Sequence, residues 1–300
     1  MASTHSYEID PRNLEIKIYV NGDIVPRDQA KISVFDSGFL LGDGMWESFR
    51  FHNGKLAFAK EHLLRLHENA KALDIDLGKS DQEIIAAIFD TLKANQMDTD
   101  VHIRLIVSRG LKSTPYQDPR VNTGSATLVI IPEYKVATGV DFPLNLYTVY
   151  VRRGRPDSQD PRLHPLSKMN CILACIQATK AGADEGLMLD PDGFVAACNS
   201  TSFFIIRQGQ VWTSTGKYCL QGITRENIIN LCQQNDIEVY QKDFSLIDVY
   251  SADESFVTGT FGGVKPVANV DGRQIGDGKP GSMTARLGKL YNDLVDRECR

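Results

Sequence analysis

Four strand–turn–strand patterns constrain this 300-residue chain more than any other feature of its sequence. Each pattern has two short apolar runs joined by a turn with glycine: Asn21-Gly22, Asn53-Gly54, Asp192-Gly193 and Gln208-Gly209. Asn-Gly and related pairs favour the backbone conformations of tight hairpin turns. Helices are predicted between and after the hairpins, at 60–75, 168–182, 224–235 and 282–297. A Ser80–Glu83 capping box predicts the start of a further helix. This order favours an α+β protein with antiparallel or mixed sheets.

The length of the chain predicts two domains, because single hydrophobic cores stop growing at about 250–300 residues. We expect a flexible N-terminal tail at 1–14 and a small N-terminal domain at 15–135. An interdomain linker at 136–144 then leads to a larger C-terminal domain at 145–300.

Composition and charge exclude several classes of partner. A net charge of -5 gives no polycationic surface, so nucleic acid is not an expected partner. No apolar run approaches the roughly 20 residues of a membrane span, and the first ten residues lack a signal pattern. The six cysteines form no C-x-x-C pair and no cluster with zinc spacing. We therefore expect a cytoplasmic protein with no membrane partner and no metal site.

The segment from Leu220 to Arg225, LQGITR, is the strongest candidate site. Gly222 precedes a predicted helix whose first turn offers unpaired backbone N–H groups and the positive end of the helix dipole. Thr224 adds a hydroxyl in that first turn. These groups suit a phosphate, although a plain N-capped helix has the same local sequence.

L-x-G-I-T-R is a hallmark of the fold-type IV, or class IV, pyridoxal-phosphate aminotransferases, and the chain resembles this family along nearly its whole length after the tail. Residues 35–47, FDSGFLLGDGMWE, resemble the N-terminal motif of its D-amino-acid and (R)-amine branches. Residues 61–66 resemble its H-x-x-R-L element, 257–266 its later strand and loop, and 271–281 its last turn. The resemblance implies a small N-terminal α/β sandwich and a C-terminal pseudo-barrel domain that binds the cofactor.

The resemblance also assigns expected roles to individual residues. The cofactor phosphate would be bound by Arg65, Gly222, Ile223, Thr224 and Thr260. The substrate would be met by Leu41, Trp46, Phe261 and, from the loop after residue 109, by Arg120. Arg65 could equally be a solvated helix residue, Thr260 a turn residue, and the apolar side chains core residues.

The family's catalytic lysine, which binds the cofactor covalently, is replaced in this sequence. Spacing back from Gly182 and Glu185 puts the lysine position at 163 or 164, and spacing forward from Arg152-Arg153 and Asp160-Pro161 gives His164. Lys168 follows four residues later, in the predicted first turn of a helix after Ser167. Three hypotheses stay open: Lys168 is a relocated catalytic lysine, His164 is a general base, or His164 is a structural residue.

A second replacement affects the cofactor ring. The family places a glutamate against the pyridine nitrogen, which keeps that nitrogen protonated and the ring a strong electron sink. Counting from Asp190 to Gly193, the same position is Ala197, and no carboxylate stands within two residues of it.

These observations predict an aminotransferase-like protein with an altered catalytic site. It would bind pyridoxal 5′-phosphate and transfer an amino group between a small amino acid or amine and a 2-oxo acid. The cofactor could be bound without a covalent link, or it could be pyridoxamine 5′-phosphate. One alternative is a non-covalent lyase, dehydratase or isomerase that uses His164 as its base. Another is a catalytically inactive homologue with a binding role. The resemblance also implies a homodimer.

Overall fold

The computed structural model describes residues 10–135 and 142–300. Within these ranges the chain forms two compact units. We name them the N-terminal unit (10–135, 164–168 and 298–300) and the C-terminal unit (142–163 and 169–297). The sequence predicted a contiguous division at 135 and 145, whereas 164–168 and 298–300 group with the N-terminal unit. Residues 1–9 of the predicted tail and 136–141 of the predicted linker lie outside the described residues.

The N-terminal unit is built on an antiparallel six-stranded sheet with the order β2-β1-β6-β5-β3-β4. Its strands are β1 (Lys17–Val20), β2 (Asp23–Pro26), β3 (Gly44–His52), β4 (Lys55–Ala57), β5 (Val101–Ser108) and β6 (Thr127–Tyr134). The two hairpins predicted here are confirmed. Asn21 and Gly22 turn between β1 and β2, and Asn53 and Gly54 between β3 and β4, all four with positive φ.

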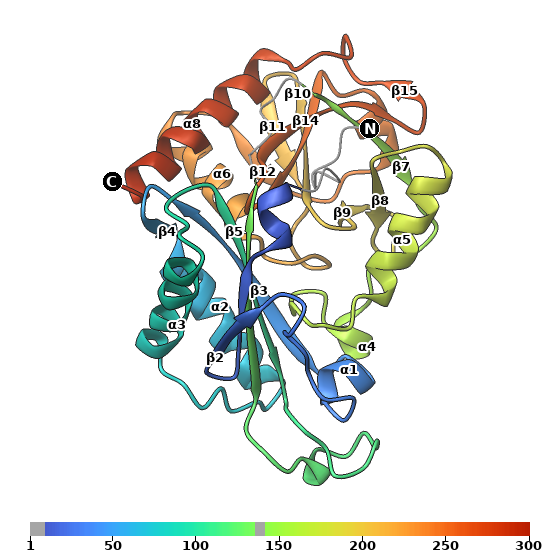
Figure 1. Cartoon of the computed structure of the whole chain (residues 1–300). Coiled ribbons are helices and arrows are strands. Elements are labelled where there is room, and N and C mark those ends of the chain that lie inside the picture. Colours follow the sequence, from blue (N-terminus) through green and yellow to red (C-terminus); the bar gives the residue numbers. More distant parts are fainter. Residues whose placement is uncertain (1–9, 136–141) are drawn as a thin grey trace. The chain divides into compact units, whose positions relative to one another are not determined.

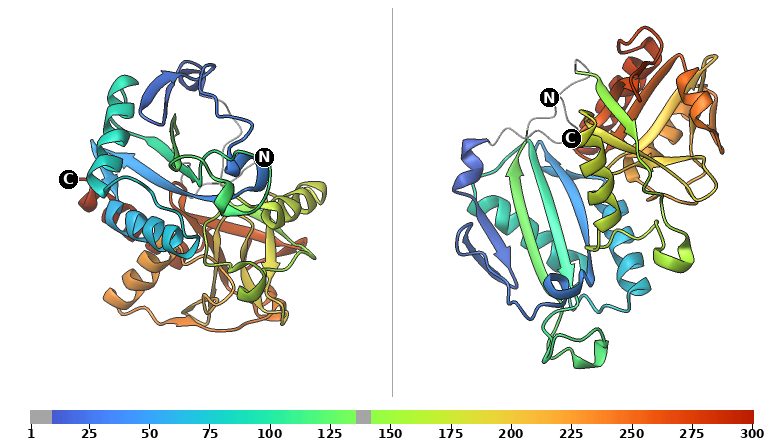
Figure 2. Two further views of the ribbon diagram at one scale, coloured as in Figure 1. Left: turned by 90° about the horizontal axis from the view of Figure 1, so that it is seen from below. Right: turned by 90° about the vertical axis from the view of Figure 1, so that its right-hand side faces the viewer.

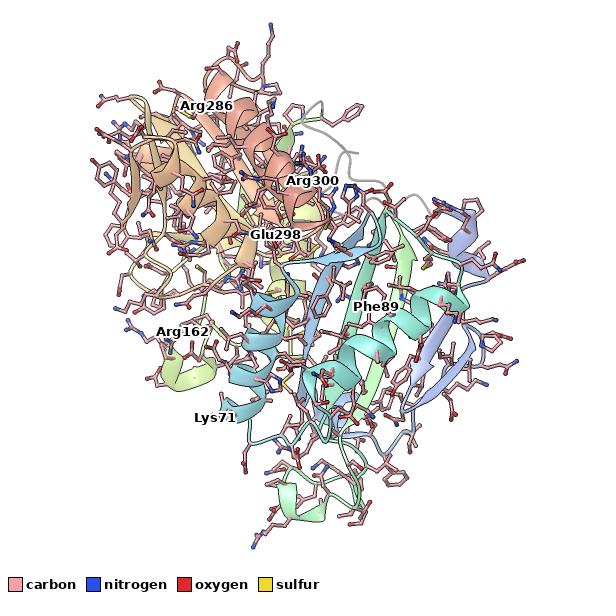
Figure 3. All side chains as sticks on the ribbon, turned by 90° about the vertical axis from the view of Figure 1, so that its left-hand side faces the viewer. Lys71, Phe89, Arg162, Arg286, Glu298 and Arg300 are labelled. Carbon is pink, nitrogen blue, oxygen red and sulfur yellow. The ribbon has the colours of Figure 1, made fainter. Side chains whose placement is uncertain are left out.

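Helices α2 (Ala59–Ala72) and α3 (Asp81–Ala94) cover one face of this sheet (Figures 1 and 2). Their apolar stripes supply Leu63, Leu66, Ile84 and Ile88 to a core shared with β3 and β5. The predicted capping box is present at the start of α3, where Ser80 and Glu83 bond each other's backbone N–H. Figure 3 labels Phe89 on α3, and its ring lies edge-on to that of Phe51, at 6.0 Å between centroids.

Three short helices complete this unit: η1 (Pro11–Leu14), α1 (Ser37–Leu41) and η2 (Pro119–Val121). The predicted loose tail is wrong for residues 11–14, because Asn13 is buried. The Asn13 side chain donates to the carbonyl oxygen of Tyr134 at 2.9 Å and accepts from the Tyr134 N–H at 2.8 Å. This pair fixes η1 to the end of β6.

The segment 164–168 runs along the first residues of β3. The N–H of Trp46 donates to the carbonyl of His164, and the N–H of Leu166 donates to the carbonyl of Gly44, both at 3.0 Å. Met45 and Pro165 form the β-bridge between them. The residues at the predicted lysine position are therefore held by main-chain bonds to the β3 edge.

The C-terminal unit contains a nine-stranded mixed sheet with the order β12-β11-β10-β13-β14-β7-β8-β9, and β15 pairs with β14. Its strands are β7 (Leu144–Thr148), β8 (Glu185–Leu189), β9 (Val195–Cys198), β10 (Ser202–Arg207), β11 (Gln210–Thr213), β12 (Val239–Gln241), β13 (Glu254–Gly259), β14 (Gly263–Val270) and β15 (Arg273–Gln274). The predicted β8–β9 and β10–β11 hairpins are confirmed. The predicted strand at 145–151 ends earlier, at Thr148.

The helices of this unit are α4 (Pro156–Gln159), α5 (Met169–Lys180), α6 (Ile223–Gln234), α7 (Leu246–Tyr250) and α8 (Ser282–Glu298). Helix α5 lies against β8, where Ala174 packs with Val149 and Met188 (Figure 1). The opposite core contains Phe203, Val257 and other inward residues of β7 to β10, β13 and β14. Among the described residues, no helix is long and apolar enough to cross a bilayer.

Candidate functional site

The start of α6 leaves backbone N–H groups without acceptors. Gly222 is the N-cap residue, and no side chain of the described residues caps this end of the helix. The N–H groups of Ile223, Thr224 and Arg225 have no acceptor among the described residues. Such an end attracts an anion, because the orphan donors and the helix dipole act together.

The start of α8, in the same unit, provides a contrast. There the carboxylate of Glu254 accepts from the N–H of Met283 at 3.0 Å and from that of Thr284 at 2.7 Å. A resident anion therefore satisfies the first turn of α8. The first turn of α6 has no such group.

Hydroxyl groups gather beside the start of α6. Thr224 is buried, and its Oγ1 lies 3.4 Å from Tyr291 Oη. A Cβ atom on Gly222 would lie 3.2 Å from Ser202 Oγ, and Ser202 pairs with Thr258 between β10 and β13. The Thr258 hydroxyl is buried without a partner among the described residues. Thr260, which was predicted from the family resemblance, follows β13 directly and is half-buried, whereas Thr258 two residues earlier was not predicted.

The donors at the start of α6 and these hydroxyls fit a phosphate group. Glycine at 222 lets the backbone approach β10 closely, since a side chain there would press on Ser202. The part of the predicted phosphate site that belongs to the C-terminal unit thus has suitable chemistry.

In the N-terminal unit, Arg65 is held by a carboxylate. Its Nε lies 2.7 Å from Glu47 Oε1, and its Nη2 lies 2.8 Å from Glu47 Oε2. Glu47 lies on β3 with its side chain 1% exposed, and it also contacts His62 Nδ1 at 2.8 Å. The spacing of three residues between His62 and Arg65 puts both side chains on the face of α2 that meets β3. This bidentate ion pair fixes the orientation of the Arg65 guanidinium.

His164 joins the same buried cluster. Its Nδ1 lies 3.6 Å from Glu47 Oε1, and its ring packs on Trp46 with 3.8 Å between centroids. The N–H of His164 donates to Asn69 Oδ1 at 2.7 Å. Burial lowers the pKa of His164 to about 3, against the opposite effect of the Glu47 carboxylate. The imidazole is therefore neutral at pH 7.

Glu47 stays ionised in this cluster. Burial alone would raise the pKa of Glu47, but Arg65 and the two neighbouring histidines hold this pKa well below its usual value. Burial also lowers the pKa of His62. The cluster thus contains one carboxylate, one guanidinium and two neutral imidazoles, and its formal charges cancel.

Lys168 lies immediately before α5, one residue ahead of the predicted first-turn position. Its Nζ is 6.0 Å from the centroid of the Trp46 ring, at the limit of a cation–π contact. The charge of Lys168 also contributes to lowering the pKa of His164, after the larger effects of burial and Arg65. His164 and Lys168 therefore approach the same indole from one short segment.

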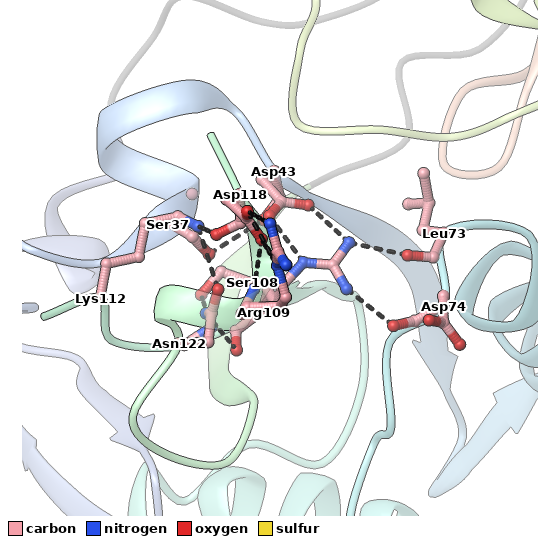
Figure 4. A network of polar contacts seen from close by, with 12 residues as sticks. Ser37, Asp43, Leu73, Asp74, Ser108, Arg109, Lys112, Asp118 and Asn122 are labelled. Atoms are coloured by element: carbon pink, nitrogen blue, oxygen red, sulfur yellow. Dashed lines mark hydrogen bonds and ion pairs between the residues drawn. The ribbon is translucent and has the colours of Figure 1, made fainter. Parts of the chain in front are cut away.

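Arg120 is placed at the surface of the N-terminal unit. Its side chain is 89% exposed and forms a bidentate pair with Asp118. The loop that carries it is anchored by Arg109, which bonds the carboxylate of Asp43 and the carbonyls of Leu73 and Asp74 (Figure 4). The base of the loop is fixed, while Arg120 projects into solvent.

The remaining predicted residues lie in both units. Leu41 ends α1 with an exposed side chain. Trp46 is a partly buried residue of β3, and Arg104 Cζ lies 4.2 Å from the centroid of its ring. Phe261 lies in the turn between β13 and β14. Ala197 is buried on β9 opposite Met188. The assembly of residues from both units into one site stays a prediction.

Comparison with known proteins gives a consistent family. The model of the family described as amino-transferase class IV matches residues 44–270. The chain is 39% identical over 95% of its length to the branched-chain-amino-acid aminotransferase-like protein 2 of Arabidopsis thaliana, but it spans only 51% of that relative. It thus covers about half the length of this relative.

Two other relatives match along most of their length. A putative branched-chain-amino-acid aminotransferase of Methanocaldococcus jannaschii is 38% identical over 93% of this chain and 96% of its own. A D-alanine aminotransferase of Listeria monocytogenes is 29% identical over 95% and 98%.

Among solved structures, the branched-chain aminotransferase of the thermophilic archaeon Thermoproteus uzoniensis with norvaline superposes with a TM-score of 0.85. It is 26% identical and covers 95% of this chain and 96% of its own. The family and the fold predicted from the sequence are confirmed.

Proposed function

Because the chain belongs to the class IV aminotransferase family, we propose that it binds pyridoxal 5′-phosphate and transfers an amino group between a small amino acid or amine and a 2-oxo acid. The observation that carries the proposal is the start of α6. Its N–H donors lack acceptors in the part of the chain that the structure describes, while the start of α8 has the Glu254 carboxylate. A phosphate would supply the missing anion at α6.

In this proposal the cofactor phosphate is bound by the first turn of α6 and its hydroxyls. The residues are Gly222, Ile223, Thr224 and Thr260, with the unpredicted Thr258 beside them. Arg65 remains the proposed cation for the phosphate. Its bond pattern with Glu47 supports a fixed guanidinium orientation, because a bidentate pair restricts rotation of the planar fork.

When bound, pyridoxal phosphate supplies an aldehyde that carries the amino group and a ring that withdraws electrons. His164 cannot hold the cofactor covalently, since it has no primary amine. Lys168 has one, and its Nζ lies in the same surroundings as His164, near Trp46. We therefore propose Lys168 as the covalent anchor and as the amine that moves the proton.

His164 acts in this proposal as a neutral group that packs on Trp46 and borders Glu47. A general base works best with a pKa near the working pH, and the pKa of about 3 makes His164 a weak base. This value argues against the alternative of a lyase, dehydratase or isomerase with His164 as its base. His164→Ala tests it directly, because loss of turnover with unchanged cofactor affinity would restore that alternative.

Incubation of the full chain with pyridoxal phosphate tests the central proposal. We expect an absorbance band of bound cofactor, and borohydride followed by peptide mass mapping should find the adduct on Lys168. Lys168→Ala should lose the adduct, while Lys180→Ala, at the exposed end of α5, should keep it. A bound cofactor without any adduct would leave only the non-covalent version, including pyridoxamine phosphate. Absence of binding would favour an inactive homologue with a binding role.

The relatives suggest which substrates to test. Their names include branched-chain amino acid and D-alanine aminotransferases, so both kinds of amino donor belong in one panel. With 2-oxoglutarate or pyruvate as acceptor, we expect turnover of one stereochemical series only. Equal turnover of L- and D-donors, or of neither, would contradict a stereospecific aminotransferase.

A homodimer is part of the proposal. Helix α5 exposes apolar side chains at helical spacing: Met169, Ile172, Leu173 and Ile176. The N-terminal unit exposes a second set, in which Val34 and Phe35 lie beside Leu111 through main-chain pairing. Apolar surface of this kind supports burial against a second copy. Sedimentation equilibrium should give twice the chain mass.

The six free cysteines, which form no disulfide, support a cytoplasmic location.

A further inference from the structure

A buried arginine of the C-terminal unit has few acceptors. Arg153 follows β7, and its N–H bonds the carbonyl of Leu189 on β8. Its guanidinium donates to the carbonyl of Cys198 and lies 3.6 Å from Cys171 Sγ. Arg153 is only 9% exposed, and its Nε is buried without a partner among the described residues.

No carboxylate contacts this guanidinium in the described part of the chain. The buried carboxylate of the same region, Glu185, instead accepts from Thr201 Oγ1 at 2.8 Å. A buried charge is normally paired, because leaving water costs several kcal/mol per ion. Arg153 therefore lacks the partner that its burial calls for.

Arg225 is a useful contrast, because it is also buried without an ion pair. Its Nη2 donates to two oxygen atoms, the carbonyl of Ser214 at 2.6 Å and Gln241 Oε1 at 2.9 Å. One of the two acceptors of Arg153 is a sulfur, which is a weak acceptor. Both arginines leave Nε without a partner among the described residues, so Arg153 differs from Arg225 in having a sulfur in place of a second oxygen acceptor.

The surroundings of Arg153 include Ala197. Cys198, whose carbonyl Arg153 bonds, follows Ala197 on β9. Ala197 pairs with Met188, and Met188 packs against Ala174 of α5. Cys171 lies one turn before Ala174 on the same helix. The guanidinium is thus bonded to the residue that follows Ala197 and lies near Cys171 of α5, and the alanine side chain offers no acceptor.

We propose that Arg153 donates a hydrogen bond to the ring nitrogen of bound pyridoxal phosphate, beside Ala197. This inference rests on the proposed function. A guanidinium at this place favours the unprotonated nitrogen, whereas a carboxylate would favour the protonated one. The ring nitrogen is then a hydrogen-bond acceptor, and Arg153 acts on the electronic state of the cofactor without taking part in proton transfer.

Affinity for two cofactor analogues tests the inference without any turnover. The probes are pyridoxal phosphate and its 1-deaza analogue, in which a C–H replaces the ring nitrogen. The wild-type full chain should bind pyridoxal phosphate at least about tenfold more tightly, as expected for a hydrogen bond to a charged donor. Arg153→Met should bring the ratio close to one. Arg155→Met is the matched control, because Arg155 is exposed and pairs with Asp192 at the surface, and it should leave the ratio unchanged.

The outcomes separate the two proposals. If both probes bind wild-type protein with equal affinity, or if Arg153→Met keeps the wild-type ratio, the role of Arg153 is wrong while cofactor binding stands. If neither probe binds, the proposed function fails and the inference fails with it. Should Arg153→Met not fold, the ring ¹⁵N resonance of labelled cofactor decides. It should be that of an unprotonated pyridine in wild-type protein and of a protonated one in Ala197→Glu, and a protonated signal in both would overturn the inference.

Discussion

Arg65, which is partly buried, and Arg153, which is buried, have different partners in the chain. Arg65 has a bidentate carboxylate partner in Glu47, and two histidines surround that carboxylate. Arg153 has a carbonyl and a sulfur, and no carboxylate contacts it among the described residues. The charge of Arg65 is therefore paired with a carboxylate of the same unit. The charge of Arg153 has no such carboxylate among the described residues, and for this reason we propose that it binds a ligand.

The comparison also separates stability from function. A self-sufficient ion pair costs most when one member is removed, because the other is left as an uncompensated buried charge. Removal of an unpaired buried cation should lower the free energy of unfolding little in the ligand-free protein. Its removal should instead weaken the binding of the ligand. Variants at the two arginines should therefore respond to different measurements.

The largest effect is expected for Glu47→Gln. It leaves Arg65 buried beside a neutral amide, and the free energy of unfolding should fall by about 3–5 kcal/mol. Urea denaturation followed by Trp46 fluorescence in a Trp212→Phe background measures it. The exposed Glu68 on the same helix as Arg65 supplies the control, and Glu68→Gln should change stability little.

A double variant sharpens this result. Glu47→Gln with Arg65→Met removes both charges, so it should be less destabilised than the sum of the single variants. Additive costs would show that the pair is not a coupled unit. A Glu47→Gln variant as stable as Glu68→Gln would contradict the cluster altogether.

The next effect is a change in the pH dependence of stability. The pKa of His164 is lowered to about 3 in the folded protein, so between pH 6.5 and 3 the unfolded state binds a proton that the folded state does not. Stability contributed by this residue is therefore lost as the pH falls, by about 1.4 kcal/mol per pH unit. His62, whose pKa is also lowered, adds loss of the same sign.

In His164→Leu the unfolded state should no longer bind the extra proton at this residue. Unfolding free energies measured between pH 6 and 5 should then fall less steeply with acid than in the wild-type protein. An unchanged slope in His164→Leu would mean that His164 is not held neutral by burial.

Local features of the fold could be predicted from the sequence because they depend on neighbouring residues. The Asn-Gly turns and the Ser80–Glu83 capping box each lie within four residues, and all formed as predicted. The motif at Leu220 likewise identified the start of α6. The structure added that no side chain within 10–135 and 142–300 caps this helix, which depends on where the other elements lie.

The buried clusters could not be predicted in the same way. Glu47 belongs to a recognised motif, but its partners come from α2 and from residue 164, far along the chain. The i, i+3 spacing of His62 and Arg65 was a usable signal that they share a helix face. In the sequence, Arg153 served only as a point from which to count forward to residue 164. That no described carboxylate contacts it is a property of three-dimensional packing.

A smaller effect is expected when a carboxylate is offered to Arg153. Ala197→Glu inserts a larger, charged side chain into a buried strand, so its single cost includes overpacking. In an Arg153→Met background the introduced carboxylate lacks its cation and should cost about 1–3 kcal/mol more. Thermal or urea unfolding of the four proteins in this cycle gives the coupling. Zero coupling would place Ala197 out of reach of Arg153.

The smallest effect on stability is expected at Arg120, a third arginine that contrasts with both others. Its pair with Asp118 has short contacts, yet the side chain is 89% exposed, and exposed pairs contribute little because water and salt screen them. Arg120→Ala should leave the melting temperature unchanged. If Arg120 meets a substrate carboxylate, as the family resemblance predicts, KM should rise for 2-oxo acids and stay constant for an amine without a carboxylate. An equal change for both substrates would show that the arginine acts on the loop, and no change for either would remove it from the site.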